Sequence, residues 1–266
     1  MKNCLTIAGS DCSAGAGIQA DIKAMSACGV YAMSVITSVV AENTSRVVSV
    51  YDLPGEVIKQ QIDAVFEDIP VDGVKIGMIK SPSIMQAVAE KLKQYSPCNV
   101  VADPVMSAKD GCALMDEAAL DVLKNEIIPA CTLLTPNIPE AELIAQMKID
   151  SQRDMMQCAK KIYAMGCGAV LVKGGHYGGM PIDILYDGNG FYKYSSPRIN
   201  TKNTHGTGCT LSSAITAFLA KGNSIQQSVL LGKRYVYNAI KNSLEIGKGH
   251  GPLHHFYDYY SMKGFE

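Results

Sequence analysis

The sequence has no excess charge of either sign, no paired cysteine motif and no long apolar run. Its 24 Lys and Arg residues balance 25 Asp and Glu residues. This balance gives no case for nucleic acid or a membrane surface as a partner. The nine cysteines include no CxxC pair, which argues against a disulfide framework or a zinc site and favours a reduced, cytoplasmic setting. The apolar stretch 30–41 is too short to span a bilayer, and the N-terminal apolar run is too short for a signal peptide.

The sequence also lacks the Gly-x-x-x-x-Gly-Lys-Ser/Thr string of a Walker-type phosphate loop. It does contain Gly15-Ala-Gly-Ile-Gln-Ala20, which matches a dinucleotide fingerprint, with Glu42 in the place of the ribose-binding acid. In that fingerprint the first glycine follows directly on the strand, whereas residues 10–14 separate Gly15 from Gly9 here. Two other interpretations are a substrate loop in which Asp21 and Glu42 hold a small polar ligand, and a plain glycine-rich turn.

Apolar runs and helical spacing alternate along the chain. Strands are predicted at residues 5–8, 31–40, 74–76, 99–102, 132–134 and 169–172, with a small extra strand at 47–51 and a hairpin of 182–186 and 191–194. Helices are predicted at 17–28, from Pro54, and at 83–95, 117–125, 154–165, 207–220 and 224–243. This alternation predicts an α/β fold with a mainly parallel sheet covered on both faces. No linker or repeat divides residues 1–266, so we expect a single domain.

The carboxyl ends of parallel strands meet at one edge of a sheet, and ligands bind at that edge in such folds. This rule places the following loops together at that edge: 9–21, 41–45, 77–80, 103–110, 135–140, 173–178 and 200–210. We therefore expect the functional residues in these loops.

The segment Asn200-Thr-Lys-Asn-Thr-His-Gly-Thr-Gly-Cys-Thr210 runs into a helix of small residues. Glycines at 206 and 208 let a ligand approach the backbone, and the N–H groups of residues 207–210 would lie in a first helical turn without internal partners. Such a turn is an anion site, and its positive field favours the thiolate of Cys209. We interpret the segment as the place of phosphate chemistry. Two alternatives are a hydrolase with Cys209 as nucleophile and His205 as base, and a buried structural cysteine.

Asn137 and Glu140 follow the strand at 132–134. Helix capping alone would explain Asn137, and a carboxylate is favourable in a first helical turn anyway. Alternatively, Glu140 holds hydrated Mg²⁺, and Asp103, at the end of a neighbouring strand, could do the same.

Several segments along the whole chain carry a family resemblance. They are Thr6-Ile-Ala-Gly-Ser-Asp11, Gly15-Ala-Gly-Ile-Gln-Ala-Asp-Ile-Lys23, Lys75-Ile-Gly-Met78, Asp103-Pro-Val-Met106, Thr135-Pro-Asn-Ile-Pro-Glu-Ala141, Val172-Lys-Gly-Gly175, the segment 200–210 and Gly247-Lys-Gly-His-Gly-Pro-Leu-His-His255. They resemble the hydroxymethylpyrimidine/phosphomethylpyrimidine kinases of thiamine biosynthesis, in the ribokinase-like superfamily. The resemblance implies a three-layer α/β/α sandwich and the use of ATP and Mg²⁺. It implies phosphorylation of 4-amino-5-hydroxymethyl-2-methylpyrimidine and then of its monophosphate.

The resemblance also implies roles for particular residues. Cys209 takes the place of the catalytic base, and Gly206, Thr207 and Gly208 form the anion hole. The residues implied around the pyrimidine are Ala8, Gly9, Asp21, Glu42 and Met78. Those implied on the ATP side are Asp103, Asn137, Lys173, Thr204 and Lys233, with Glu140 and Asp103 at the Mg²⁺ ion. A homodimer is common among such relatives.

Glu42 departs from the best-known family pattern, which reads Ala-Gln-Asn-Thr where this chain has Ala41-Glu-Asn-Thr44. A glutamine amide can donate to a ring nitrogen and accept from the 4-amino group, whereas an ionised glutamate only accepts. The change predicts either pH-dependent pyrimidine binding or a shift toward a pyridine such as pyridoxal. Pyridoxal kinases, which share the first loop and a cysteine-bearing glycine loop, are therefore the alternative. A non-catalytic vitamin-binding protein is a more distant one.

Overall fold

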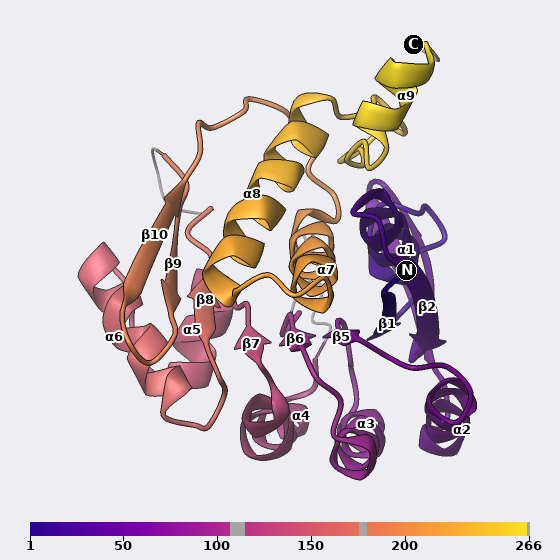
Figure 1. Cartoon of the computed structure of the whole chain (residues 1–266), viewed down its shortest axis with the longest axis vertical. Helices are drawn as coiled ribbons and strands as arrows, with labels where there is room; N and C mark the ends of the chain where they lie inside the picture. Colours follow the sequence, from indigo (N-terminus) through magenta and orange to yellow (C-terminus); the bar gives the residue numbers. More distant parts are fainter. Residues whose placement is uncertain (107–114, 176–179, 265–266) are drawn as a thin grey trace.

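The computed structural model describes residues 1–106, 115–175 and 180–264. Its main feature is an eight-stranded sheet with the strand order β10-β9-β8-β7-β6-β5-β1-β2 (Figure 1). The strands are β1 Asn3–Ala8, β2 Tyr31–Ile36, β5 Gly73–Ile76, β6 Val100–Ala102, β7 Leu133–Leu134, β8 Val170–Val172, β9 Ile182–Tyr186 and β10 Phe191–Ser195. From β2 to β8 all neighbours are parallel, and β9 pairs antiparallel with both β8 and β10. The predicted mainly parallel sheet is confirmed.

Helices cover both faces of this sheet (Figure 1). One face carries α1 Gly17–Ala27, α7 Thr207–Ala220 and α8 Ile225–Lys241. The other carries α2 Gly55–Phe66, α3 Pro82–Tyr95, α4 Glu117–Val122, α5 Ile138–Ala145 and α6 Gln152–Tyr163. The predicted α/β/α sandwich is therefore confirmed. A further helix, α9 Tyr257–Lys263, lies near the C-terminus and has no counterpart in the sequence-based prediction.

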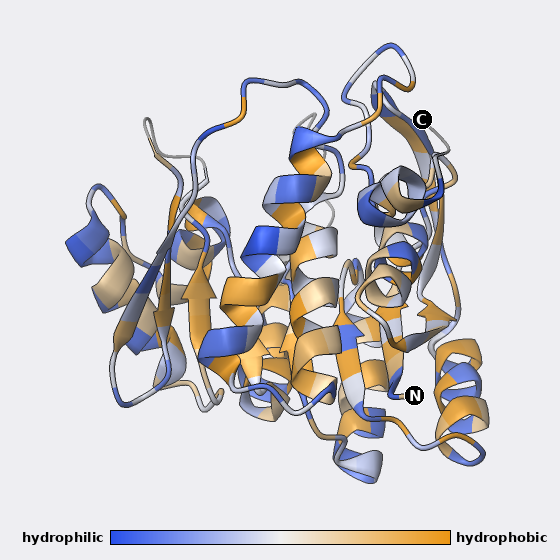
Figure 2. Ribbon diagram, turned by 45° about the horizontal axis from the view of Figure 1, so that its top comes forward, coloured by the Kyte–Doolittle hydropathy of each residue, from blue (hydrophilic) through white to orange (hydrophobic). Residues whose placement is uncertain are grey.

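The core explains why the strands are apolar throughout. In β6, Val100 and Ala102 pack with the α2–α6 layer, and Val101 between them packs with Leu211 and Ile215 of α7. Successive side chains of a strand point to opposite faces, so a strand covered on both sides needs an apolar residue at every position. Figure 2 shows the apolar strands enclosed by helices that turn polar residues outward.

The single strand predicted at 31–40 is wrong. The structure breaks it at Thr37 into β2 and a separate strand, β3 Ser38–Asn43, which pairs antiparallel with β4 Arg46–Asp52 in a two-stranded sheet. The last pair of β1 and β2 joins Ala8 to Ile36. Beyond Ala8 the regular pairing with β1 ends, although the Ser10 N–H still donates to the Ser38 carbonyl at 2.8 Å, and the chain pairs with β4 instead. Glu42 thus belongs to the small sheet.

One further element differs in detail from the prediction. The helix predicted at 117–125 ends its α-helical part at Val122 and continues as a π-helical turn, Leu123–Ile127, and a 3₁₀ turn, Ile128–Ala130.

In the residues that the structure describes, no helix combines the length and apolarity needed to cross a bilayer.

Candidate active site

The predicted loops meet at the carboxyl edge of the main sheet. Each of five parallel strands is followed there by a candidate segment, and α7 begins beside them. These segments start at Gly9 after β1, Gly77 after β5, Asp103 after β6, Thr135 after β7 and Lys173 after β8. The parts of loops 103–110 and 173–178 from Ser107 and His176 onward lie outside the described residues.

The two glycine-rich loops pack against each other. Gly206 has φ +77°, and a Cβ there would lie 1.8 Å from the carbonyl oxygen of Gly15. A Cβ on Gly15 would in turn lie 2.3 Å from the His205 ring. Only glycine fits such close backbone approaches at a positive φ. Gly15 therefore supports the loop before α7, and α1 starts only at Gly17, unlike a dinucleotide fingerprint in which the glycines open the turn directly after the strand.

The first turn of α7 offers fewer free N–H groups than expected. The Thr210 N–H donates to the Gly206 carbonyl at 2.9 Å, and the Thr207 N–H makes a long bond to the Thr204 carbonyl at 3.4 Å. Within the described part of the chain, the N–H groups of Gly208 and Cys209 make no hydrogen bond. These two groups are the ones directed at an incoming anion in the first turn of a helix.

A buried acid–lysine pair lies directly against this turn. The Lys173 Nζ atom contacts Asp103 Oδ1 at 2.5 Å, and Thr135 Oγ1 donates to the same oxygen at 3.2 Å. A Cβ on Gly208 would lie 3.0 Å from Asp103 Oδ2 and 3.5 Å from Lys173 Nζ. Opposite charges thus stand beside the two free N–H groups, and a side chain at 208 would intrude between them.

Asn137 and Glu140 form a complete capping box at the start of α5. Asn137 Oδ1 accepts from the Glu140 N–H at 2.9 Å, and Glu140 Oε2 accepts from the Asn137 N–H at 2.7 Å. The capping interpretation is confirmed. Glu140 is only 5% exposed. Burial raises the pKa of its carboxyl to about 7, with Lys173 opposing and Asp103 adding to the effect. Glu140 therefore belongs electrostatically to the Asp103–Lys173 pair, and its role at Mg²⁺ stays a prediction.

The surroundings of Cys209 do not favour the thiolate form of its side chain, so the expectation that the first helical turn would favour it is wrong. Burial raises the pKa of the thiol to about 11, although Lys75 lowers it. The cost of removing the half-buried sulfur from water outweighs the attraction of the Lys75 ammonium group, a balance that the sequence does not reveal.

Asp21 lies beneath the site and is 0% exposed. Its Oδ2 atom accepts from Thr6 Oγ1 at 2.6 Å and from Lys75 Nζ at 2.7 Å, and its Oδ1 atom accepts from Ser213 Oγ at 2.7 Å. Both oxygens are thus taken up by protein donors, and direct contact with a pyrimidine stays a prediction that these contacts do not support. Sequence reasoning missed Lys75 as the partner of Asp21, although two signals were present: a lysine inside the apolar strand β5 and its place in a segment that carries the family resemblance.

Glu42 lies beside two residues of the other loops. A β-bulge at Ala41 and Glu42 interrupts the pairing of β3 with β4. A carboxylate oxygen of Glu42, a carboxylate oxygen of Asp11 and a ring nitrogen of His205 all lie within 4.8 Å of one another. Since bulges re-aim side chains at sheet edges, the small sheet presents Glu42 to the same cluster as the two glycine-rich loops.

Asp11 and His205 hold these loops together. Asp11 accepts from the N–H groups of Ser13, Gly15 and Ala16 at 2.7, 3.0 and 2.7 Å. The His205 Nε2 atom lies 2.9 Å from Asp11 Oδ2. Burial raises the pKa of Asp11, but the bonds from His205, Ser13 and Ala16 outweigh it and bring the pKa to about 2. His205 is therefore engaged with Asp11, which argues against the Cys209–His205 hydrolase.

The remaining predicted residues fall into two groups. Ala8 is buried at the end of β1, and the Met78 side chain lies over Gly9, where a Cβ would meet its methyl carbon at 2.4 Å. Lys233 of α8 pairs with Asp183 at 2.5 Å, and Asp183 accepts from the Gly174 N–H at 2.9 Å. Lys233 is thus tied to the segment that follows Lys173.

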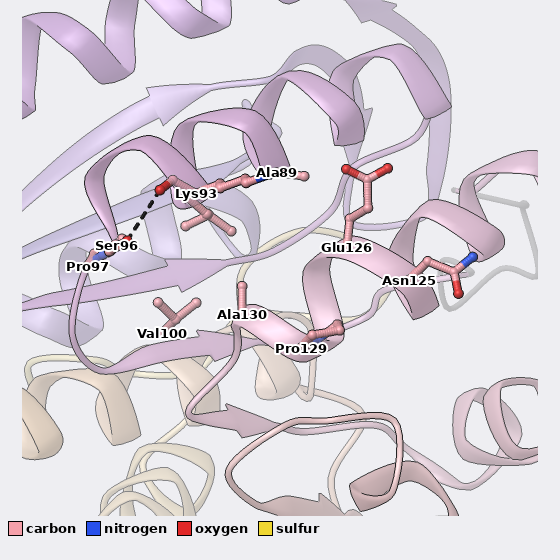
Figure 3. Close-up of a pocket in the computed structure, with 10 residues that line it drawn as sticks. Ala89, Lys93, Ser96, Pro97, Val100, Asn125, Glu126, Pro129 and Ala130 are labelled. Atoms are coloured by element: carbon pink, nitrogen blue, oxygen red, sulfur yellow. Dashed lines mark hydrogen bonds between the residues drawn. The ribbon is translucent and has the colours of Figure 1, made fainter.

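A cavity of about 520 Å³ lies elsewhere on the molecule (Figure 3). Leu92, Val100 and Pro129 are among its apolar lining, and Lys93, Asn125 and Glu126 among its polar lining. Val100 opens β6, whereas the candidate site follows the other end of that strand. No predicted site residue lines this cavity.

The fold and the site define a small-molecule kinase of the ribokinase-like class. A family model described as phosphomethylpyrimidine kinase matches residues 11–254, and the chain belongs to that family. The hydroxymethylpyrimidine/phosphomethylpyrimidine kinase of Bacillus subtilis is 46% identical over 254 residues, which cover 95% of this chain and 94% of that protein. The thiamine biosynthesis bifunctional protein of Geobacter sulfurreducens is 46% identical over 252 residues, covering 94% of this chain. The chain spans 51% of that longer relative.

Solved structures show the same relationship. A phosphomethylpyrimidine kinase from Clostridium difficile superposes with a TM-score of 0.82 at 48% identity, covering 90% of this chain and 100% of that one. A pyridoxal kinase from Staphylococcus aureus, in complex with AMP-PCP and pyridoxal, has a TM-score of 0.89 at 32% identity, covering 97% of this chain and 95% of that one.

Proposed function

We propose that this protein transfers the γ-phosphoryl group of ATP to the hydroxyl of 4-amino-5-hydroxymethyl-2-methylpyrimidine, and then a second phosphoryl group to the resulting monophosphate. Both steps would serve thiamine biosynthesis. The observation that carries the proposal is the free Gly208 and Cys209 N–H pair beside Asp103 and Lys173. Phosphoryl transfer depends mainly on positioning and charge neutralisation, which such an arrangement supplies.

On the phosphate side, we assign anion binding to Gly206, Thr207 and Gly208 and assign Lys173 to the transferred phosphate. A related kinase has been solved with the ATP analogue AMP-PCP, which supports ATP as the phosphoryl donor. The buried carboxylates of Asp103 and Glu140 fit a hard cation, so we assign Mg²⁺ to them. When bound, Mg²⁺ would neutralise phosphate charge. Asn137, Thr204 and Lys233 complete the proposed nucleotide side.

On the alcohol side, we assign the pyrimidine to Ala8, Gly9, Met78 and Glu42, with Asp21 acting from beneath. Cys209 is the proposed acceptor of the hydroxyl proton. Its high thiol pKa means that little thiolate is present near neutral pH, so the protein must stabilise negative sulfur locally for this role.

A coupled ADP-release assay tests the proposal with three acceptors: the pyrimidine, its monophosphate and pyridoxal. We expect turnover with the first two that depends on added Mg²⁺. Absence of ADP release with both pyrimidines would refute the function, and release with the first alone would refute the second phosphorylation.

Pyridoxal phosphorylation is the second candidate. Two observations favour it: the TM-score of 0.89 with a pyridoxal kinase, and Glu42 in place of the glutamine of the pyrimidine kinases. Comparison of kcat/KM for pyridoxal and the pyrimidine decides between the two. A Glu42→Gln variant that shifts the ratio toward the pyrimidine would assign the preference to this residue.

We further propose a single-domain, cytoplasmic enzyme that forms a homodimer. The small sheet supports the dimer, because Val39 and Tyr51 are cross-strand partners that are 48% and 66% exposed. Light scattering on the wild type and on Tyr51→Glu tests it, since a charge within a buried apolar interface would dissociate the dimer. A monomeric wild type would refute it.

A further inference from the structure

Lys75 is a charged residue in the centre of the sheet. It lies in β5 between Val74 and Ile76, and its side chain is 0% exposed. The partner carboxylate, Asp21, is also 0% exposed and lies 2.7 Å away. A buried ion pair of this kind is no more stable than well-packed apolar residues of the same volume. Stability alone therefore gives no reason for placing these charges here.

The pair is joined to α7, the helix whose first turn carries Cys209, by a hydrogen bond from Ser213. Ser213, which donates to Asp21 at 2.7 Å, follows Cys209 by one turn of α7. On the other side, a Cβ on Gly77 would lie 2.5 Å from Lys75 Nζ and 2.9 Å from the Ala8 Cβ atom. The ammonium group is thus enclosed between α7 and the strand ends that we assign to the pyrimidine.

We infer that Lys75 is a positioning residue that stabilises negative charge on the Cys209 sulfur, and that Asp21 holds and balances Lys75. This inference deepens the proposed function and rests on it. In the transfer step, the O–H bond of the alcohol breaks and an S–H bond forms on Cys209. The alcohol oxygen bonds to the γ-phosphorus, whose bond to the bridging oxygen breaks and leaves its electron pair on ADP.

The local charges support this arrangement. Burial raises the pKa of the Cys209 thiol, Lys75 lowers it, and Asp21 and Asp103 raise it. The Lys75 pKa is itself raised by Asp21 and Cys209, despite burial, so its positive charge persists. Lys173 also interacts with Cys209, from the segment after β8. Among the residues that the structure describes, the charges acting on the sulfur therefore include Lys75, Asp21, Asp103 and Lys173.

The test measures alkylation of Cys209 by iodoacetamide at about pH 9, by peptide mapping with mass spectrometry. We expect Lys75→Met to slow alkylation about threefold and Asp21→Asn to accelerate it about threefold. A pKa change of about one unit alters the thiolate fraction tenfold, which the opposite change in nucleophilicity partly offsets. The exposed Cys12 and Cys98 serve as internal references in every sample.

The opposite directions distinguish an electrostatic role from a structural one, because a disturbed pocket would change the rate in the same direction in both variants. Ser213→Ala is the matched control, since it removes one bond to Asp21 without changing a charge, and we expect it to alkylate as the wild type does. Any pattern other than slower in Lys75→Met and faster in Asp21→Asn overturns the inference. Alkylation needs no substrate, so its result is independent of whether the protein proves to be a kinase.

Either single variant leaves a buried charge without its partner and could unfold the protein. The double variant Lys75→Met/Asp21→Asn removes both charges together and keeps the site neutral. Since Lys75 has the larger effect on the sulfur, we expect slower alkylation than in the wild type. If a single variant fails to fold, an equal or faster rate in the double variant overturns the inference.

Discussion

Glu140→Gln offers the sharpest test of the electrostatics at the proposed Mg²⁺ position. Between pH 4.5 and about 7, the native protein holds a proton on Glu140 that the unfolded chain has released, because burial raises the pKa of this carboxyl from an ordinary value of 4.5 to about 7. Glutamine keeps the capping box, since its carbonyl oxygen can accept from the Asn137 N–H as the carboxylate does. The substitution therefore removes the titration and leaves the helix cap in place.

The direction in which pH changes the free energy of unfolding follows from proton linkage. Between pH 4.5 and 7 the native state binds more protons at Glu140 than the unfolded state does, so the free energy of unfolding falls as pH rises through this window. The shift corresponds to a loss on the order of 3 kcal/mol between the two ends. In Glu140→Gln this loss is absent.

Urea unfolding of both proteins at several pH values between about 4.5 and 8 measures the effect. The substitution removes the titration of Glu140 together with its coupling to Asp103 and Lys173, so the difference between the two curves reports the proton uptake of this cluster. We expect the stability of the variant relative to the wild type to increase by on the order of 3 kcal/mol as pH rises. Parallel curves would refute the raised pKa and the reasoning from burial.

The same proton predicts a metal effect. Mg²⁺ binds the carboxylate and not the acid, so binding at Glu140 must release a proton when the pH is below about 7. Calorimetry of Mg²⁺ and AMP-PCP binding in buffers of different ionisation enthalpy should show more proton release near pH 6 in the wild type than in Glu140→Gln, where only the ligand loses protons. Equal release in both would remove Glu140 from the metal site.

Three further predictions concern the glycine loop, the pyrimidine and the thiol. Gly206→Ala should lower the free energy of unfolding by about 3 kcal/mol or more, because the new Cβ lies 1.8 Å from the Gly15 carbonyl oxygen. Gly175→Ala is the control, since no atom of the described residues lies within 4 Å of a Cβ there. Equal losses in urea unfolding would contradict the argument. The KM for the pyrimidine should rise with pH in the wild type, and this pH dependence should be weaker in Glu42→Gln. Parallel plots of KM against pH for the two proteins would count against a proton at Glu42. Cys209→Ser should keep substrate binding and lose most turnover; unchanged turnover would exclude Cys209 from the reaction.

Several elements were predictable from local pattern. The strands β1, β5, β6 and β8 stood out as short apolar runs, because burial on both faces demands an apolar residue at each position. The helix cap at Asn137 followed from its position before Pro139, whereas the reciprocal bond from the Asn137 N–H to Glu140 emerged only in the structure. The break at Thr37 did not follow, because the β-branched run continues through it. The pairing of β2 with β1 ends at Ala8 and Ile36, and from Ser38 the strand partner is β4, so the break depends on two other parts of the chain.

The sequence by itself determined the α/β alternation, the loops that meet at one edge of the sheet, and the glycine positions at the start of α7. These features depend on periodicity and on residue types with few conformational alternatives. Only the tertiary structure decided the proton affinities. It placed the half-buried Cys209 thiol where removal from water raises its pKa, and it paired His205 with Asp11. It also enclosed Asp21 with Lys75. Burial and charge partners come from segments far apart in the chain, so no local pattern encodes them.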